Sequence, residues 1–261
     1  MTAANEHVGT GTLGKAIDVL EAVAAAPEPL RFTDLLKLVD QPRGTLHRQI
    51  SNLIEEGLLS VRRDNSYELG LTLLKLASRA WSGNQFRAIA EPHLKRLHEL
   101  TGETVHLGVL RGVEVIYLDK VESRQAVRMY SQIGNASPVY CTGVGKAALS
   151  ALPDAELEKR LAAIVFKRHT ETTLPDLAAL RGEIAEIRAS GLAFDRQEHE
   201  VGIHCVAAPI HSRDRDFVAG VSATAPAYRI SMEQLTAWGP LVRETAAAIM
   251  EDMAARLGPK A

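Results

Sequence analysis

Residues 32–56 read FTDLLKLV, then DQPR, then GTLHRQISNLIEE, and this stretch decides the fold of the amino-terminal third of the chain. The last segment repeats apolar side chains at helical spacing, at Leu46, Ile50, Leu53 and Ile54. Pro42 interrupts the helical pattern between the two outer segments. Two short helices joined by so tight a break are typical of a helix-turn-helix, whose second helix enters the major groove of DNA.

The polar side of the second helix carries groups that can reach base edges and phosphates. We expect Arg48 to make the foremost contact. The full set of predicted DNA contacts is Arg43, Thr45, His47, Arg48 and Gln49 on this helix, and Arg62 and Arg63 on the segment that follows. An ordinary solvated surface is the alternative for each arginine, and His47 has the alternative of packing at the corner between the helices.

The segments on either side complete a winged helix-turn-helix. Apolar spacing from Leu13 predicts a first helix that stops before the prolines of residues 27–29, and Thr33 is the expected N-cap of the next helix. Gly57 is placed to end the second helix of the motif. Residues 58–62 and 67–69 then predict two strands joined by a turn, which form the wing.

Charge argues weakly against DNA binding. The net charge is −2, and residues 1–70 contain ten acidic but only seven basic side chains. A DNA-binding domain is usually basic on its contact face. The sequence therefore leaves open a second hypothesis, in which the amino-terminal domain contacts another protein.

Bulk properties indicate a protein of two domains. A chain of 261 residues can bury two separate cores. No apolar run approaches the roughly 18 residues of a membrane span, and the first residues lack the pattern of a signal peptide. Cys141 and Cys205 lie far apart without an export signal, which favours reduced thiols in a cytoplasmic protein without membrane contact.

The pattern changes after the wing. Residues 70–82 predict a helix with Leu71, Leu74 and Trp81, which either forms a dimer contact or packs on its own domain. Further helices are predicted at 85–100, 143–152, 154–164, 175–190 and 231–257, and strands at 103–110, 113–121, 126–130, 191–194, 205–210 and 217–223. Mixed helices and mainly antiparallel strands define an α+β class. The expected organisation is a disordered leader (1–10), a winged helix-turn-helix domain (11–69), a linker helix (70–84) and a second domain (85–261).

Two stretches of the second domain are its most specific parts. They are PVYCTGVGKAAL at residues 138–149 and DRQEHEVGIHCVAAPI at residues 195–210. Together with the winged helix-turn-helix they resemble the IclR family of bacterial transcriptional regulators, over about residues 10–258. Residues 128–134, RMYSQIG, look closest to regulators of sugar-acid catabolism, including repressors that answer to 2-keto-3-deoxygluconate. The resemblance implies a GAF-like effector-binding domain, a homodimer and often a dimer of dimers.

The resemblance also implies an effector pocket over the sheet. Carried onto matching positions, the pocket includes Met129, Cys141, Gly143, Val144, Asp195, Ile203, Cys205, Ser222 and Thr224. Residues 142–145 open a helix, so free backbone N–H groups and a partial positive charge suit a carboxylate there. Ser222 and Thr224 lie two apart on a strand and therefore share a face, where they suit ligand hydroxyls.

Each pocket residue also has a purely structural interpretation. Gly143 and Gly145 permit close helix packing, Asp195 stabilises a turn, Cys205 and Met129 fill the core, and Ser222 and Thr224 bond locally. His106, Cys141, His199, His204 and Cys205 have the chemistry of zinc ligands but not the spacing, so we expect no metal. Nothing marks an activated nucleophile, so we expect no enzymatic activity and no cofactor.

These observations predict a ligand-responsive transcription factor. It would bind double-stranded operator DNA, and a small carboxylate such as a keto sugar acid would control it. Repression of a catabolic operon is the expected role. The alternatives are an activator that senses an aromatic acid, and a small-molecule-binding module without DNA function.

Overall fold

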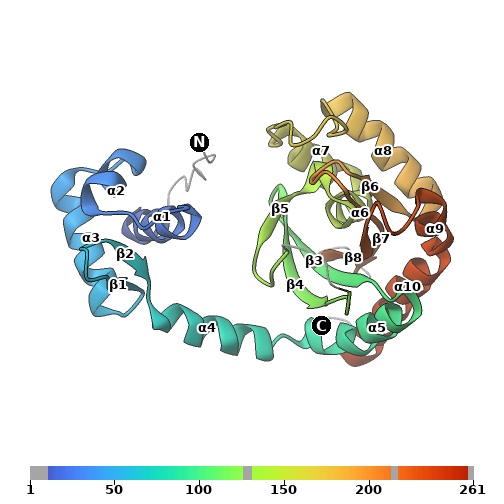
Figure 1. Cartoon of the computed structure of the whole chain (residues 1–261), viewed down its shortest axis with the longest axis horizontal. Coiled ribbons are helices and arrows are strands. Elements are labelled where there is room, and N and C mark those ends of the chain that lie inside the picture. The colour runs from blue at the N-terminus through green and yellow to red at the C-terminus, as the bar shows by residue number, and fades with distance from the viewer. Residues whose placement is uncertain (1–10, 126–130, 213–216, 258–261) are drawn as a thin grey trace. The chain divides into compact units, whose positions relative to one another are not determined.

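The computed structural model describes residues 11–125, 131–212 and 217–257 and divides the chain into two compact units, residues 1–83 and 84–261 (Figure 1). The predicted leader, the predicted strand at 126–130 and most of the polar turn before the last strand lie outside the described residues.

The first unit is a winged helix-turn-helix followed by one more helix. Its elements are α1 (Gly11–Ala25), α2 (Phe32–Leu38), α3 (Arg43–Glu55), β1 (Leu59–Val61), β2 (Tyr67–Leu69) and α4 (Leu71–Ser82). Leu35 of α2, Leu46 of α3 and Leu59 of β1 are fully buried and meet in one core. The strands pair antiparallel, with Ser60 opposite Glu68. The predicted helix-turn-helix and wing are thus present.

The ends of the two motif helices differ in how well the sequence predicts them. Gly57 follows α3 with φ +68°, as a glycine after a helix end does. The prediction of Thr33 as N-cap is wrong, because α2 begins at Phe32 and Arg31 is the capping position. The Asp34 carboxylate instead accepts the backbone N–H of Arg31 at 3.0 Å, so a first-turn acid satisfies the helix start from inside.

The second unit is built around a six-stranded antiparallel sheet in the order β5-β4-β3-β8-β7-β6. The strands are β3 (Thr104–Arg111), β4 (Glu114–Val121), β5 (Ala136–Pro138), β6 (Ala193–Arg196), β7 (Ile203–His211) and β8 (Val218–Pro226). The helices are α5 (Gln85–Thr101), α6 (Gly143–Ala151), α7 (Asp154–Ala162), α8 (Leu177–Ser190), α9 (Met232–Ala237) and α10 (Gly239–Leu257), with a 3₁₀ turn, η1 (Val139–Cys141), before α6. This confirms the predicted α+β class.

Helices cover both faces of the sheet. Alternate residues of β7 show this, because Val206 and Ala208 pack in the core with α5 and α10, while Ala207 packs with α6 and α8. Figure 1 shows α10, the last helix of the chain, beside α5. α6 is buried along its whole length between the sheet and α8.

The structure contains two helices at the carboxyl end where the sequence predicts one. The sequence predicts a single helix over residues 231–257, but α9 ends at Ala237 and α10 begins at Gly239. Pro240 has no backbone N–H to bond the carbonyl of Thr236, so the helical ladder cannot pass this point. The proline fits the first turn of α10, where its missing N–H leaves no bond unmade.

Candidate functional site

A cavity of about 240 Å³ lies on the α6 side of the sheet. All six strands of the sheet, the amino end of α6 and two connecting segments contribute to its walls. The lining residues are His106, Tyr117, Ser131, Asn135, Ala136, Ser137, Thr142, Gly143, Val144, Asp195, His199, Glu200, Ile203, Cys205, Ser222 and Thr224. Among the described residues, none that lines the cavity is a lysine or arginine. The described lining therefore offers an anion backbone N–H groups and neutral donors.

Two central strands supply the polar floor of the cavity. Strand pairing sets His106 of β3 opposite Ser222 of β8. His106 Nδ1 lies 3.2 Å from Thr224 Oγ1, and His106 Nε2 lies 2.6 Å from Ser131 Oγ. Ser222 Oγ lies 3.3 Å from Thr224 Oγ1, so the hydroxyls form one connected set.

His106 is a neutral member of this set. Burial lowers the pKa of its imidazole to about 3, and the positive charge of Lys120 acts in the same direction. The ring therefore contributes one N–H donor and one acceptor, not a positive charge, across the physiological range. Tyr117 lies beside it, with ring centroids 5.1 Å apart.

Asp195 forms the opposite wall. Burial raises the pKa of its carboxyl to about 7, although the N–H of Glu198 donates to Asp195 Oδ1 at 2.7 Å and opposes the rise. The side chain is 7% exposed. Near neutral pH this group is poised between a neutral donor and an anion.

The amino end of α6 points at the cavity. Thr142 caps the helix, and its Oγ accepts the N–H of Gly145 at 3.3 Å. Thr142, Gly143 and Val144 all line the cavity. Backbone dipoles give such a helix end a partial positive charge that favours an anion.

Most of the residues predicted for the effector site come together here. Gly143, Val144, Asp195, Ile203, Cys205, Ser222 and Thr224 line the cavity. Cys141 does not, because η1 turns it into the core formed with Val139 and Leu149. Met129 lies outside the described residues. Gly143 also has the packing role that the sequence left open, since a Cβ there would lie 2.4 Å from Cys205 Sγ.

Sequence reasoning missed several residues of the cavity lining, above all His106, Tyr117 and Ser131. A polar His106 between apolar Val105 and Leu107 was a usable signal, because alternation places it on the face away from the core. Its pairing with β8, more than a hundred residues later, is not readable from spacing.

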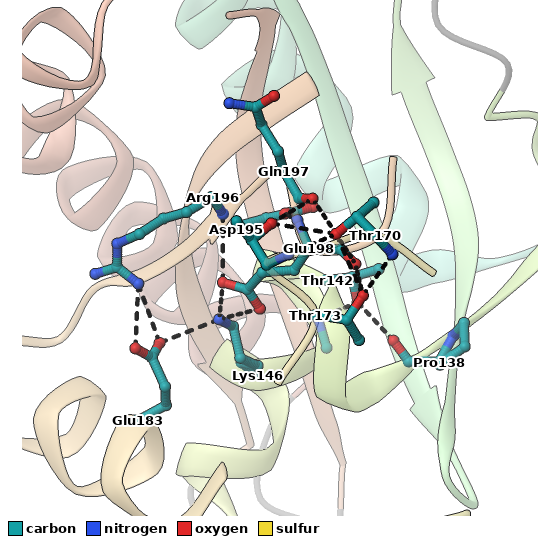
Figure 2. A network of polar contacts seen from close by, with 12 residues as sticks. Pro138, Thr142, Lys146, Thr170, Thr173, Glu183, Asp195, Arg196, Gln197 and Glu198 are labelled. Atoms are coloured by element: carbon teal, nitrogen blue, oxygen red, sulfur yellow. Dashed lines mark hydrogen bonds and ion pairs between the residues drawn. The ribbon is translucent and has the colours of Figure 1, made fainter. Parts of the chain in front are cut away.

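A buried ion-pair network behind the cavity was also missed. Lys146 of α6 is 0% exposed, and its Nζ lies 2.6 Å from each carboxylate oxygen of Glu198 and 3.1 Å from Glu183 Oε2. Arg196 bonds Glu183 on the outer side at 3.1 Å. Figure 2 shows the four side chains in one chain of contacts.

The predicted DNA contacts on α3 divide between the surface and the interior. Arg43, His47 and Arg48 are exposed, and Thr45 is half-buried. The prediction for Gln49 is wrong for the described chain, because its side chain is 3% exposed and its Nε2 donates to the Thr12 carbonyl at 3.4 Å.

Packing modifies some of the remaining DNA candidates. Arg43 lies over the Phe32 ring at 5.4 Å, and the His47 ring meets the same phenyl edge-on at 6.0 Å, so His47 packs at the helix corner as well as facing outward. Arg62 and Arg63 are exposed on the wing, and Arg62 pairs with Glu68 at 3.7 Å.

The two cysteines show no sign of activation. Burial raises the pKa of the Cys205 thiol to about 12 and raises that of Cys141 as well, so both remain protonated at neutral pH. Among the described residues, no cluster of three or more histidine, cysteine or acidic side chains is arranged to hold a metal. The described part of the chain also contains no helix with the length and apolar character needed to cross a membrane.

Family models match both units. The model "Bacterial transcriptional regulator IclR C-terminal" matches residues 79–251, and the model "IclR helix-turn-helix domain" matches residues 12–63. The chain belongs to the IclR family of transcriptional regulators.

Individual relatives agree with this assignment. The IclR-family chain is 32% identical over 254 residues to the regulator BhcR of Paracoccus denitrificans, covering 97% of this chain and 91% of BhcR. It is 30% identical over 240 residues to KdgR of Escherichia coli, covering 92% and 91% of the two chains. The solved structure of an IclR homologue from Microbacterium hydrocarbonoxydans, complexed with 4-hydroxybenzoate, has a TM-score of 0.74 at 26% identity and covers 94% of this chain and 99% of its own.

These comparisons confirm the predicted family and the predicted regulator function. The matched proteins are transcriptional regulators and not enzymes, which decides against a cysteine nucleophile as the purpose of the cavity. They also decide against a module unrelated to DNA, because the helix-turn-helix match covers α3 and its exposed arginines.

Proposed function

We propose that this IclR-family regulator represses a catabolic operon and is controlled by a small carboxylate, such as a keto sugar acid, bound in the cavity. The observation that carries the proposal is the composition of the cavity wall. A helix amino end faces a set of hydroxyls and a neutral imidazole, and the lining residues that the structure describes include no lysine or arginine. A carboxylate fits the helix end, and ligand hydroxyls fit Ser222, Thr224 and Ser131.

The size of the cavity supports a small metabolite. A volume of about 240 Å³ is somewhat below the range of drug-sized ligand pockets, which begins near 300 Å³. An aromatic acid is the second candidate, because the rings of His106 and Tyr117 line the cavity and a structural neighbour was solved with 4-hydroxybenzoate. Activation instead of repression would accompany this alternative.

We also propose a homodimer that contacts DNA through α3 and the wing, with a dimer of dimers as the larger assembly. α4 supports the dimer, since it contains no buried residue and exposes Leu71 and Leu74, at 82% and 67%. Effector binding would shift the balance between two arrangements of the paired units by a differential affinity of roughly 1–3 kcal/mol.

An electrophoretic shift on the promoter of the neighbouring operon tests the DNA half of the proposal. Arg48→Ala should abolish the specific shift, because Arg48 is the exposed arginine in the middle of α3. Arg256→Ala, on the exposed side of α10, is the matched control and should shift DNA normally. An unchanged shift for Arg48→Ala would show that α3 does not read the operator.

A thermal-shift screen over keto sugar acids and aromatic acids tests the effector half. A compound that raises the melting temperature of the wild-type protein should lose this effect in the double variant Asp195→Ala/Ser222→Ala. A response that persists in the double variant would place the binding site elsewhere.

A further inference from the structure

Lys146 is a charged side chain with no exposure to water, and its surroundings explain how it is tolerated. Burying an ammonium is very unfavourable unless carboxylates pair with it and satisfy its N–H groups. Glu198 and Glu183 both do so, and Arg196 balances the second carboxylate from the outer side. The four side chains together carry no net charge.

The two carboxylates belong to very different elements. Glu183 lies on α8, a regular helix packed against α6. Glu198 lies in the connection between β6 and β7, and its neighbours His199 and Glu200 line the cavity. Through Glu198, Lys146 therefore joins the buried helix α6 directly to a wall of the cavity. Glu183 joins Lys146 to α8 and reaches that wall only through its bond to the Arg196 side chain.

The connection runs on to a residue that faces the ligand space. The N–H of Glu198 donates to Asp195 Oδ1 at 2.7 Å, and the N–H of Arg196 donates to Glu198 Oε1 at 3.3 Å. Figure 2 shows the Glu198 carboxylate beside the Lys146 side chain. Displacement of the Glu198 carboxylate would thus move the wall at Asp195.

The same connection contains a residue in an unfavourable backbone conformation. Gln197 has φ +63°, a left-handed value that side chains other than glycine seldom adopt. Thr170 and Thr172 donate to its carbonyl at 2.7 and 2.8 Å, and its own Oε1 accepts the N–H of Gly202 at 2.8 Å. A segment of this kind keeps its shape only when its surroundings fix it from several sides.

We infer that Lys146, acting through the Glu198 carboxylate, is the positioning residue that fixes residues 195–202 as one wall of the cavity. It does not line the cavity itself. That this wall receives an effector rests on the proposed function; that Lys146 fixes it does not.

The chain supplies a matched pair of variants for the test. Glu198→Gln and Glu183→Gln each remove one carboxylate charge from the same lysine, and in each case the other carboxylate remains. Hydrogen exchange of the full-length protein without ligand is measured for the amides of residues 196–202, with the amides of β3 and β8 as a measure of global stability. Glu198→Gln should accelerate exchange in residues 196–202 about tenfold and leave β3 and β8 unchanged, since bonds to charged groups exceed neutral ones in strength. Glu183→Gln should accelerate residues 196–202 less than Glu198→Gln does, because Glu183 reaches this segment only through the exposed Arg196 side chain, and should leave β3 and β8 unchanged.

Equal exchange of residues 196–202 in the two variants would overturn the inference, as would acceleration of β3 and β8 in parallel, which indicates a role in overall stability only. Lys146→Met is the stronger variant and should accelerate residues 196–202 further. If it does not fold, the glutamine pair still decides.

Calorimetry with 2-keto-3-deoxygluconate and 4-hydroxybenzoate as probes separates the two proposals. Weaker binding of a probe by Glu198→Gln than by Glu183→Gln supports both the proposed effector site and the positioning role of Lys146. A wild-type protein that binds neither probe but keeps the exchange contrast would count against the proposed effector class alone.

Discussion

At the scale of single residues, the cavity is distinguished by two titratable groups that burial makes neutral. His106 has a pKa near 3, so its ring is uncharged, and Asp195 has a pKa near 7, so its carboxyl is protonated in mildly acidic solution. Both shifts oppose the charge that each side chain carries in water near neutral pH or below. The cavity therefore gains negative charge as the pH rises through 7.

Affinity for a carboxylate effector should follow this titration. At pH 6 Asp195 is mostly neutral and does not repel the ligand, whereas at pH 8 it is ionised, so binding should be about tenfold weaker at pH 8 than at pH 6. Asp195→Asn should bind equally at both values. Calorimetric titration across this range is the measurement, and Glu251→Gln, on the surface of α10, is the control that should keep the wild-type pH profile.

Asp195 should also affect stability with a defined sign. Its pKa in the folded protein lies above its ordinary value of 3.8, so its contribution to the free energy of unfolding is fully present below pH 3.8 and is lost as the pH rises through about 7. Urea denaturation at pH 5 and pH 8 should show a smaller loss of stability in Asp195→Asn than in the wild type. A loss of equal size in both proteins would contradict the raised pKa.

A glycine pair tests how tightly α6 packs on the sheet. Gly143→Ala would bring a Cβ to 2.4 Å from Cys205 Sγ and should lower the free energy of unfolding by about 1–3 kcal/mol. Gly182→Ala, in the middle of α8 with open space around it, should raise the free energy by about 0.5–1 kcal/mol. Denaturant unfolding of both variants compares them, and equal effects would mean that α6 has room to move.

At the scale of elements, Gln49 shows what helical periodicity can and cannot decide. Its position lies three residues after Leu46 and four before Leu53, so it belongs to the buried stripe of α3 by spacing alone. The polar character of the side chain favours a DNA contact, but the helical spacing correctly places it among the buried residues. Arg48, one position earlier, lies outside that stripe and is exposed.

The wing should contribute affinity without sequence preference. Arg63 is exposed, and phosphate contacts depend on salt in proportion to the charges neutralised. Arg63→Ala should weaken binding equally on operator and unrelated DNA and reduce the slope of log affinity against log salt by about 1. Arg48→Ala should instead remove the difference between the two DNAs. Fluorescence anisotropy at several salt concentrations measures both effects, and a change in specificity for Arg63→Ala would assign the wing a base contact.

Most helices and strands could be predicted from the sequence, because amphipathic spacing and turn residues act locally. The order of the strands could not, since β3 pairs with β8 across more than a hundred residues. The same limit applies to the site. Ser222 and Thr224 were predicted to share a face, but His106 becomes their neighbour only through this pairing. Lys146 and Glu198 likewise meet across 52 positions of the chain.

At the scale of the whole molecule, α4 stands out because its apolar side chains are exposed to solvent. Leu71, Leu74 and Leu76 are all more than half exposed, although the helix belongs to the first compact unit. If α4 forms the proposed dimer contact, Leu74→Gln should shift the protein toward monomer in sedimentation velocity and weaken operator binding, because the apolar contact is lost. Lys75→Gln, the neighbouring exposed position, should sediment as the wild type does. A Leu74→Gln protein that remains dimeric would assign the dimer contact to another surface.

A helix of twelve residues with none buried has little packing of its own to hold it, and isolated helices of this length are marginal in water. For α4, acquiring a partner and becoming rigid are therefore expected to be a single event. For the proposed dimeric repressor, occupancy of the promoter would then rise more steeply than in simple proportion to the number of copies in the cell. Growth that dilutes such a repressor would release its target genes even before any metabolite accumulates.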